Sequence, residues 1–336
     1  MKIVDKFLEK GYLLSPELID NIDEETANRI IPKLTKTDLV LDKKTLNLLT
    51  KDIKIKLIRE NKQSKNIRKV SDFVEFYNQR LDYLSKILEE KIDSKNINTI
   101  NKLSYGTEAI LIGMVREVSE KSFKIEDKTG SLNCFSGDIP IEDDVVAVKG
   151  VMKKDGFIVD RIYYPDVPLT HKTNNTKEDC YVIFSKKTTD ISRETSFIFT
   201  KELDKKITKK TKSTIITSEE KINLPNINNF REPFLVEING VKVFVVNLER
   251  GVLEKKLNEK DSKKIITLLL KRRHFLPFEF KEGDPYLIEE IPDIVFVTGL
   301  GEPFFLNHKG ITIISVDEET SYLVNLKNRE VEEIKK

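Results

Sequence analysis

The spacing of apolar residues changes period along this chain, and that change limits the fold more than any other feature of the sequence. Residues 71–92 carry apolar side chains on one helical stripe: Phe73, Val74, Tyr77, Leu81, Leu84 and Leu88. From Gly106 apolar and polar residues alternate, which is typical of strands. After about residue 178 strand-like and helix-like segments follow one another. A single layer cannot accommodate all three patterns, so the sequence predicts a multidomain α+β protein.

The first 65 residues read as a small helical module. Ser15 is placed as a helix N-cap, with Pro16 at the first helical position. Residues 22–34 and 42–58 follow with helix-like spacing. A basic linker, residues 62–69, leads to the striped helix, for which Ser71 is the predicted N-cap. We expect residues 66–103 to be linker and long helix, and the stripe to be core packing.

Residues 104–168 contain five short strand patterns, in 108–115, 122–135, 143–152 and 156–164, with a hairpin turning at Asp127–Gly130. Five short strands in so few residues predict a small β-barrel of the OB type. Phe123, Phe135 and Phe157 alternate with charged neighbours. That pattern fits a barrel interior, which we favour, and also fits base stacking on single-stranded nucleic acid.

A proline-rich, polar connection covers residues 165–179 and predicts a domain boundary, with His171 as an exposed loop residue. Strands are expected at 180–184, 213–217, 293–297, 310–315 and 321–326. Asn239-Gly240 predicts a hairpin within 234–246. Helices are expected over 190–210 and over 261–275, the latter capped by Asp261. We predict an α/β domain over 178–317 and a C-terminal strand with a charged tail over 318–336.

Composition excludes several classes of protein. The chain has 336 residues, with 58 basic and 56 acidic side chains and a net charge of +2. That balance argues against nucleic acid as the main ligand, although a local basic patch would still fit. Cys134 and Cys180 lie far apart in no metal-binding spacing, so we expect no zinc and a reducing, cytoplasmic setting. No apolar run is long enough for a membrane span.

The histidine count bears directly on chemistry. Only His171, His274 and His308 are present. Two-metal hydrolases take several imidazole and carboxylate ligands from converging loops, and ligands bind beyond the carboxyl ends of strands in open α/β sheets. At those ends this chain places Lys186, Lys187 and the Thr298–Glu302 turn. The sequence therefore predicts no metal, no cofactor and no hydrolytic activity.

Four stretches, in this order, resemble the small subunit of archaeal family-D DNA polymerase. They are the helix VSDFVEFYNQRLDYLSKIL, the strands from ILIGMVREV to GFIVDRIYYPDVP, the segment LLLKRRHFLP and the closing stretch YLIEEIPDIVFVTGLGEPFFLNHKGITIIS. The start, FLEKGYLLSPE, also resembles the family's helical N-terminus. The resemblance implies a helical N-terminal module, an OB domain and a calcineurin-like phosphoesterase domain.

The chain departs from the family pattern at every metal-binding motif. The resemblance implies an Asp-x-His motif near Lys186 and Thr188, a Gly-Asp motif near Ser218 and a Gly-Asn-His-Asp motif near Asn228. It implies a His-Gly pair near Asn247 and a Gly-His-x-His loop near Leu300 and Glu302. His274 remains, and we expect it to pack or bond locally at a helix end. These positions predict a degenerate phosphoesterase site.

The resemblance therefore implies a non-catalytic scaffold subunit that binds a large polymerase subunit, with DNA reached indirectly through that complex. One alternative is a paralogue outside the polymerase that binds single-stranded DNA or a replication partner through the barrel. An active 3′–5′ exonuclease or phosphodiesterase is the least favoured reading, because the ligand residues are absent.

Overall fold

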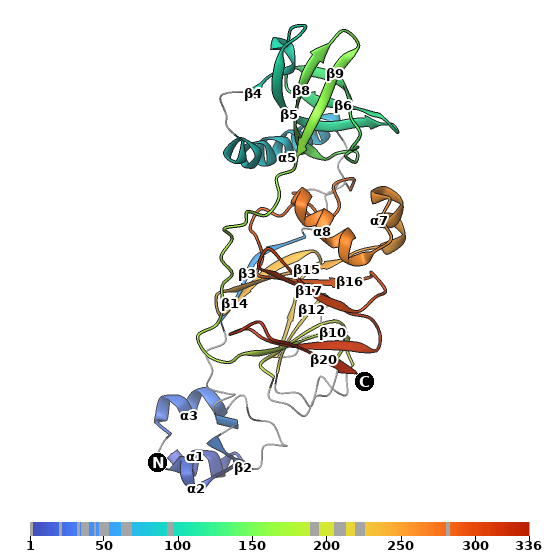
Figure 1. Cartoon of the computed structure of the whole chain (residues 1–336). Helices are drawn as coiled ribbons and strands as arrows, with labels where there is room; N and C mark the ends of the chain where they lie inside the picture. The colour runs from blue at the N-terminus through green and yellow to red at the C-terminus, as the bar shows by residue number, and fades with distance from the viewer. Residues whose placement is uncertain are drawn as a thin grey trace.

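The computed structural model describes residues 3–19, 22–31, 34, 40–43, 45–46, 54–61, 69–92, 97–188, 195–204, 213–218, 226–279 and 283–335. It is an α+β protein, mostly strands in several sheets with few helices. Figure 1 shows a small helical module at the bottom, then two stacked sheets, a pair of helices, and a barrel underlain by a long helix at the top. The predicted linker at 62–69 lies almost wholly outside the described residues.

The N-terminal module has its own small core, which includes Phe7, Leu18 and Ile30. Its elements are α1 (Ile3–Glu9), β1 (Leu13–Leu14), α2 (Pro16–Ile19), α3 (Glu24–Ile30) and β2 (Val40–Leu41). Pro16 begins α2 as predicted. Ser15 stands at the predicted N-cap position directly before α2, but its hydroxyl is buried and makes no hydrogen bond among the described residues. The capping carboxylate is Asp23, which accepts from the Thr26 N–H at 2.7 Å and so begins α3.

The predicted helix over 42–58 is wrong at its C-terminal part. Residues Ile55–Glu60 form β3, an edge strand that pairs antiparallel with β14 (Phe234–Ile238). Periodicity alone cannot separate a short apolar run in a strand from one in a helix. A partner strand from residues far along the chain supplies the hydrogen bonds that decide the outcome. Residues 47–53 of this prediction lie outside the described residues.

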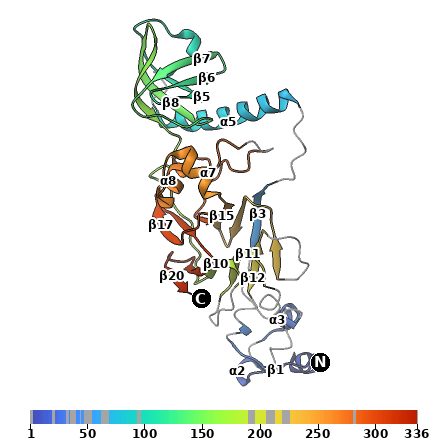
Figure 2. The same ribbon diagram turned by 90° about the vertical axis from the view of Figure 1, so that its right-hand side faces the viewer.

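The long helix is α5 (Val70–Lys91), which lies against the barrel. It begins one residue before the predicted cap, and Lys69 at the N-cap makes no side-chain capping bond. Leu84 and Leu88 are buried as expected, but Phe73 and Val74 are 42% and 54% exposed. Figure 2 shows why: the N-terminal end of α5 reaches past the barrel. The stripe is therefore core packing only along its C-terminal part.

Five strand pairings, some antiparallel and some parallel, close a barrel. The strand order is β5-β6-β7-β9-β8, and β8 pairs with β5. Its strands are β5 (Glu108–Val118), β6 (Ser122–Asp127), β7 (Gly130–Phe135), β8 (Val145–Lys153) and β9 (Gly156–Tyr163), preceded by β4 (Ile97–Asn98) and the 3-10 helix η3 (Ile100–Lys102). The hairpin at Asp127–Gly130 is confirmed. Phe123 and Phe157 fill the interior, whereas Phe135 is 37% exposed.

Two mixed sheets face each other in the part of the chain that follows the barrel. The lower sheet has the order β13-β12-β11-β10-β19-β20, and the upper sheet β17-β18-β16-β15-β14-β3. The lower strands are β10 (Tyr181–Lys187), β11 (Phe197–Glu202), β12 (Thr214–Thr217), β13 (Ile227–Asn229), β19 (Thr320–Asn325) and β20 (Val331–Lys335). The upper sheet adds β15 (Val241–Asn247), β16 (Ile294–Thr298), β17 (Phe304–His308) and β18 (Ile311–Ser315).

The core between the sheets is apolar on both sides. Phe184 and Phe199 from the lower sheet pack with Phe296 from the upper sheet. The other face of the upper sheet is covered by α7 (Arg250–Leu257) and α8 (Ser262–Arg272). Asp261 caps α8 as predicted, accepting from the Lys263 N–H at 2.9 Å.

The helix predicted over 190–210 is wrong where the structure describes it. Residues Phe197–Glu202 form β11, a strand in the middle of the lower sheet, and its apolar residues are buried. The many lysines after it suggested a solvated helix face. Residues 190–194 and 205–210 of this prediction lie outside the described residues. The Asn239-Gly240 hairpin is confirmed as the turn between β14 and β15.

Candidate functional site

Both sheets end their parallel strands at the same side of the sandwich. β10, β11, β12 and β13 run parallel in the lower sheet, and β15, β16 and β18 run parallel in the upper sheet. Glu318, in the loop from β18 to β19, reaches Lys187 at the end of β10. We call this side the strand-end edge, defined by Lys186, Lys187, Thr188, Ser218, Asn247, Glu302 and Glu318. It is where ligands bind in related sheet architectures.

The tip after β10 is occupied by an internal ion-pair group. The Lys187 Nζ lies 2.8 Å from a Glu318 carboxylate oxygen and 3.6 Å from Glu202, and Lys186 bonds the other Glu318 oxygen. Hydrogen bonds from Lys186 and Lys187 lower the pKa of Glu318 to about 2. The carboxylate at this tip is thus charged and already saturated by ammonium groups.

The remaining lower-sheet positions also bond within the protein. The Thr188 hydroxyl donates to the Glu202 carbonyl at 3.1 Å, and the Ser218 hydroxyl donates to a Glu232 carboxylate oxygen at 2.7 Å. Asn228 lies in the edge strand β13, opposite Ile216 in the register. None of these side chains is an imidazole or a carboxylate, which are the ligands that a two-metal site requires.

At the strand-end edge of the upper sheet, the backbone at Gly299 lies very close to the backbone at Leu248. The Asn247 amide oxygen accepts from the Thr298 hydroxyl at 3.0 Å. Gly299 follows with φ +90°, and a Cβ there would lie 2.0 Å from the Leu248 carbonyl oxygen. Only glycine fits such a site. Leu300 is fully buried in the core beneath α7 and α8, so this position serves packing.

Glu302 is held by a cation of the protein. Arg250 Nη1 lies 2.7 Å from Glu302 Oε1, and Arg250 Nε lies 2.6 Å from Glu254. The hydrogen bond from Arg250 lowers the pKa of Glu302. The acid that follows the glycine turn therefore anchors α7 to the loop after β16.

His274 does not join the strand-end edge. It follows the C-terminus of α8, whereas the strand-end edge lies near the N-terminus of that helix, where Arg250 bonds both the Lys260 carbonyl and Glu302. Eleven helical residues span roughly 16 Å at 1.5 Å per residue. His274 is 1% exposed, and its Nδ1 accepts from the Leu276 N–H at 3.1 Å. The expectation of local bonding at a helix end is confirmed.

His274 belongs to a buried joint between α5 and the sandwich. Its Nε2–H donates to Asp284 Oδ1 at 2.7 Å, because Nδ1 is already an acceptor. Asp284 also accepts from Arg80 Nε at 2.7 Å and from Nη2 at 3.0 Å. Burial alone would raise the pKa of Asp284, but His274 and Arg80 outweigh it and lower that pKa to about 2. We call Arg80, His274 and Asp284 the joint.

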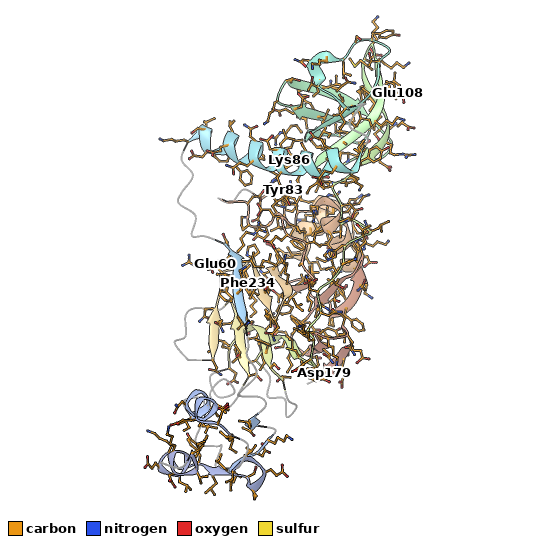
Figure 3. The ribbon with its side chains drawn as sticks, turned by 90° about the vertical axis from the view of Figure 1, so that its left-hand side faces the viewer. Glu60, Tyr83, Lys86, Glu108, Asp179 and Phe234 are labelled. Carbon is orange, nitrogen blue, oxygen red and sulfur yellow. The ribbon has the colours of Figure 1, made fainter. Side chains whose placement is uncertain are left out.

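Further contacts surround the joint. Arg272 Nε lies 3.0 Å from Asp144 of the barrel, and both side chains are almost fully buried. Tyr83 donates to the Glu289 carbonyl at 2.7 Å, and Figure 3 shows Tyr83 on the side of α5 that faces the sandwich. The sequence analysis missed this joint. A signal was present, because Arg80 continues the helical spacing of the buried Phe76, Leu84 and Leu88.

The described residues offer no metal centre and no membrane span. No group of three or more His, Cys, Asp or Glu side chains is placed there to hold a metal ion. None of the described helices is both long and apolar enough to cross a membrane.

Comparisons with known proteins confirm the resemblance seen in the sequence. No family model matches the chain. Curated relatives named DNA polymerase II small subunit are similar to it: that of Archaeoglobus fulgidus is 26% identical over 198 residues, and that of Pyrococcus abyssi is 34% identical over 127 residues. These matches cover 54% and 33% of this chain, and 40% and 20% of the relatives. The chain thus spans less than half the length of the curated relatives it matches.

Matches among solved structures are weaker. The hypothetical protein ygiW of E. coli is 22% identical, with a TM-score of 0.18. The match covers 20% of this chain and 89% of that protein. A Thermotoga maritima protein is 10% identical with a TM-score of 0.25, covering 47% of this chain and 98% of that protein. Neither carries an argument about fold or function.

Proposed function

We propose that this chain is a non-catalytic accessory subunit of a family-D-type replicative DNA polymerase, and that it binds the large catalytic subunit. Its curated relatives carry the name DNA polymerase II small subunit. DNA would reach this chain through the complex, since 58 basic and 56 acidic residues leave little excess charge for phosphate contacts.

We propose the corresponding division into domains. Residues 1–65 form the N-terminal module, 66–103 the linker and α5, and 104–168 an OB barrel. The barrel is supported by its closed strand order β5-β6-β7-β9-β8. Residues 178–317 form a degenerate phosphoesterase-like sandwich, supported by two facing mixed sheets. Within 318–336, β19 and β20 complete its lower sheet, and β3 completes the upper one.

The strand-end edge carries the functional proposal. A two-metal phosphoesterase would present free carboxylates and imidazoles there. Here Glu318 is saturated by Lys186 and Lys187, and Glu302 is held by Arg250. Ammonium and guanidinium groups would repel divalent cations. The edge supports a scaffold that has kept the backbone of such a site and has no means to hold its metals.

The joint supports the same proposal. A subunit that positions a partner benefits from parts that do not move against each other. Arg80 bonds Asp284 through two nitrogens and also donates to the Pro277 carbonyl, so α5 is tied to the sandwich by a buried network. Arg272 at the end of α8 pairs with Asp144 and ties the barrel to the sandwich as well.

A second candidate, binding of single-stranded DNA by the barrel, has one observation in its favour. Phe135 and Ile158, paired across β7 and β9, are 37% and 45% exposed on the barrel surface. An exposed aromatic ring is what base stacking requires. Phe123 and Phe157 lie inside the barrel and are unavailable for stacking.

The first expected result is the absence of a stoichiometric divalent metal at the strand-end edge. Calorimetric titration of the purified chain with Mn²⁺ should show no binding at micromolar affinity, because the described residues bring no ligand set together there. Elemental analysis provides a second measurement. One bound Mn²⁺ or Zn²⁺ per chain, lost in Glu318→Gln, would show that the edge still holds metal.

The second expected result is a stable complex with a family-D-type large subunit. Permanent interfaces bury on the order of 2,000 Å² or more and are apolar at the centre, so they depend little on salt. After co-expression, the two chains should elute together in size exclusion at about 0.5 M salt, where phosphate contacts are weak. Separate elution, together with tight single-stranded DNA binding by this chain alone at low salt, would replace the scaffold proposal with the second candidate.

A further inference from the structure

A group of basic side chains gathers where the chain leaves the barrel. The Lys91 Nζ donates to the Tyr164 carbonyl at 2.9 Å, and the Lys309 Nζ donates to the Val167 carbonyl at 3.1 Å. The Asp166 N–H donates to the backbone carbonyl of Lys271 at 2.9 Å. Arg273 lies two residues after Lys271. We call Lys91, Lys271, Arg273 and Lys309 the basic cluster. α5, α8 and the β17–β18 hairpin each contribute to it.

One carboxylate, that of Asp166, pairs with two of these four side chains. Asp166 Oδ2 lies 2.5 Å from the Lys309 Nζ and 3.9 Å from the Lys91 Nζ. Four cationic groups and one anionic group leave an excess of three positive charges. Two nearby acids are engaged elsewhere: Asp144 pairs with Arg272, and Asp293 accepts backbone N–H groups.

The excess positive charge of the basic cluster affects the pKa of Lys91. Burial lowers the pKa of Lys91, and the neighbouring Lys309 and Lys271 lower it further against the opposing effect of Asp166. Lys91 and Lys309 nevertheless keep 42% and 20% of their side-chain surface exposed, so an ion from solvent can reach them.

Arg273 adds a buried charge without a partner. It is 6% exposed, and in the part of the chain that the structure describes its Nε and Nη1 make no hydrogen bond. Burial lowers the pKa of Arg273, opposed by Asp166 and Tyr83. An uncompensated buried guanidinium is unfavourable unless an anion balances it. His308 Nε2, beside the cluster on the same hairpin as Lys309, is also buried without a partner among the described residues.

We propose that the basic cluster binds a tetrahedral oxyanion of the phosphate class. The solvent-accessible Lys91 and Lys309 contact the anion, and the buried Arg273 adds positive charge to the site. Phosphate suits such a site because it accepts several charge-assisted hydrogen bonds at once. The anion is either a small phosphate compound or a phosphate of a nucleic-acid backbone, and both present the same chemistry. This site is separate from the strand-end edge and does not depend on the proposed polymerase partner.

Thermal unfolding of the full chain with inorganic phosphate tests the proposal. At about 10 mM phosphate we expect the melting temperature to rise by about 2–4 °C above that in sodium chloride of equal ionic strength, because a ligand bound only to the folded state stabilises it. Lys309→Gln and Arg273→Gln should each abolish that difference. Lys327→Gln is the control and should keep that difference, since Lys327 pairs with Asp179 at 3.4 Å in a more exposed ion pair outside the basic cluster.

Arg273→Gln has a second expected signature. In chloride it should unfold at the same temperature as the unaltered chain or higher, because it removes an uncompensated buried charge. An equal phosphate effect in the unaltered chain, Lys309→Gln and Arg273→Gln would overturn the proposal. So would a phosphate effect no larger than that of chloride. Should Arg273→Gln fail to fold, Lys309→Gln decides by itself.

A competition experiment then distinguishes a small phosphate compound from a phosphate of a nucleic-acid backbone. If a single-stranded oligonucleotide binds, is displaced by phosphate and binds at least several-fold more weakly to Lys309→Gln than to Lys327→Gln, the anion is a backbone phosphate. If the oligonucleotide does not bind while phosphate still stabilises the chain, the anion is a small phosphate compound. An oligonucleotide that binds equally well to both variants, with no phosphate effect, contradicts the proposed site.

Discussion

Asp284→Asn should lower the free energy of unfolding of the sandwich and its attached barrel by about 3–5 kcal/mol, the usual consequence of breaking a buried ion pair from one side. Asp284 is 8% exposed and accepts from both Arg80 and His274. Asparagine has nearly the same shape and tolerates the positive φ of 42° at this position. The substitution therefore removes the charge and leaves Arg80 buried without its counter-ion. Urea denaturation followed by circular dichroism measures the change.

Two further variants identify the cause. Asp82→Asn alters another acid that pairs with a basic side chain, Lys128 at 2.6 Å, but that pair is half exposed and should change stability by no more than about 0.5 kcal/mol. Adding Arg80→Met to Asp284→Asn should recover part of the loss, since no unpaired charge then remains in the joint. An Asp284→Asn chain as stable as Asp82→Asn would mean that the joint does not hold α5 to the sandwich.

Gly299→Ala should destabilise the sandwich by about 2–5 kcal/mol. A Cβ there would lie 2.0 Å from the Leu248 carbonyl oxygen and 2.9 Å from Asn247 Oδ1. The backbone φ of +90° adds strain for any residue with a side chain. Left-handed strain accounts for about 1–2 kcal/mol and overpacking for about 1–3 kcal/mol. The midpoint of urea denaturation is again the measurement.

Gly301→Ala, two residues away, is the matched control. Its φ of +72° is also left-handed, but nothing lies within 4 Å of an added Cβ. It should lose only the strain contribution, about 1–2 kcal/mol. Equal losses in the two variants would show that the close approach of the β15 and β16 ends does not constrain the turn.

Much of the element pattern followed from the sequence because local chemistry decided it. The Asn239-Gly240 turn, the Asp261 cap of α8 and the hairpin at Asp127–Gly130 each depend on a few neighbouring residues. The sequence also determined which side chains stand at the strand ends: lysine at the end of β10, asparagine at the end of β15 and a glycine turn after β16. With three histidines in all, the chain could supply few imidazoles to that edge whatever its fold.

Tertiary structure decided the elements whose partners lie far away in sequence. Residues 55–60 and 197–202 are strands because neighbouring strands supply their hydrogen bonds, and local spacing does not record this. The stripe on α5 looked uniform, yet only the part over the barrel is covered.

The same holds for charges. Composition counts Arg80, Asp284 and Glu318 only as charged residues. Only the folded chain brings Arg80 and Asp284 together from 204 positions apart. Pairing over such separations depends on how whole domains pack. The residue types at the strand-end edge could therefore be predicted from the sequence, whereas its ion pairs and the joint could not. The physical reason is the reach of the interactions: capping and turn formation act within a few residues, whereas burial and charge pairing act between any surfaces that the fold brings into contact.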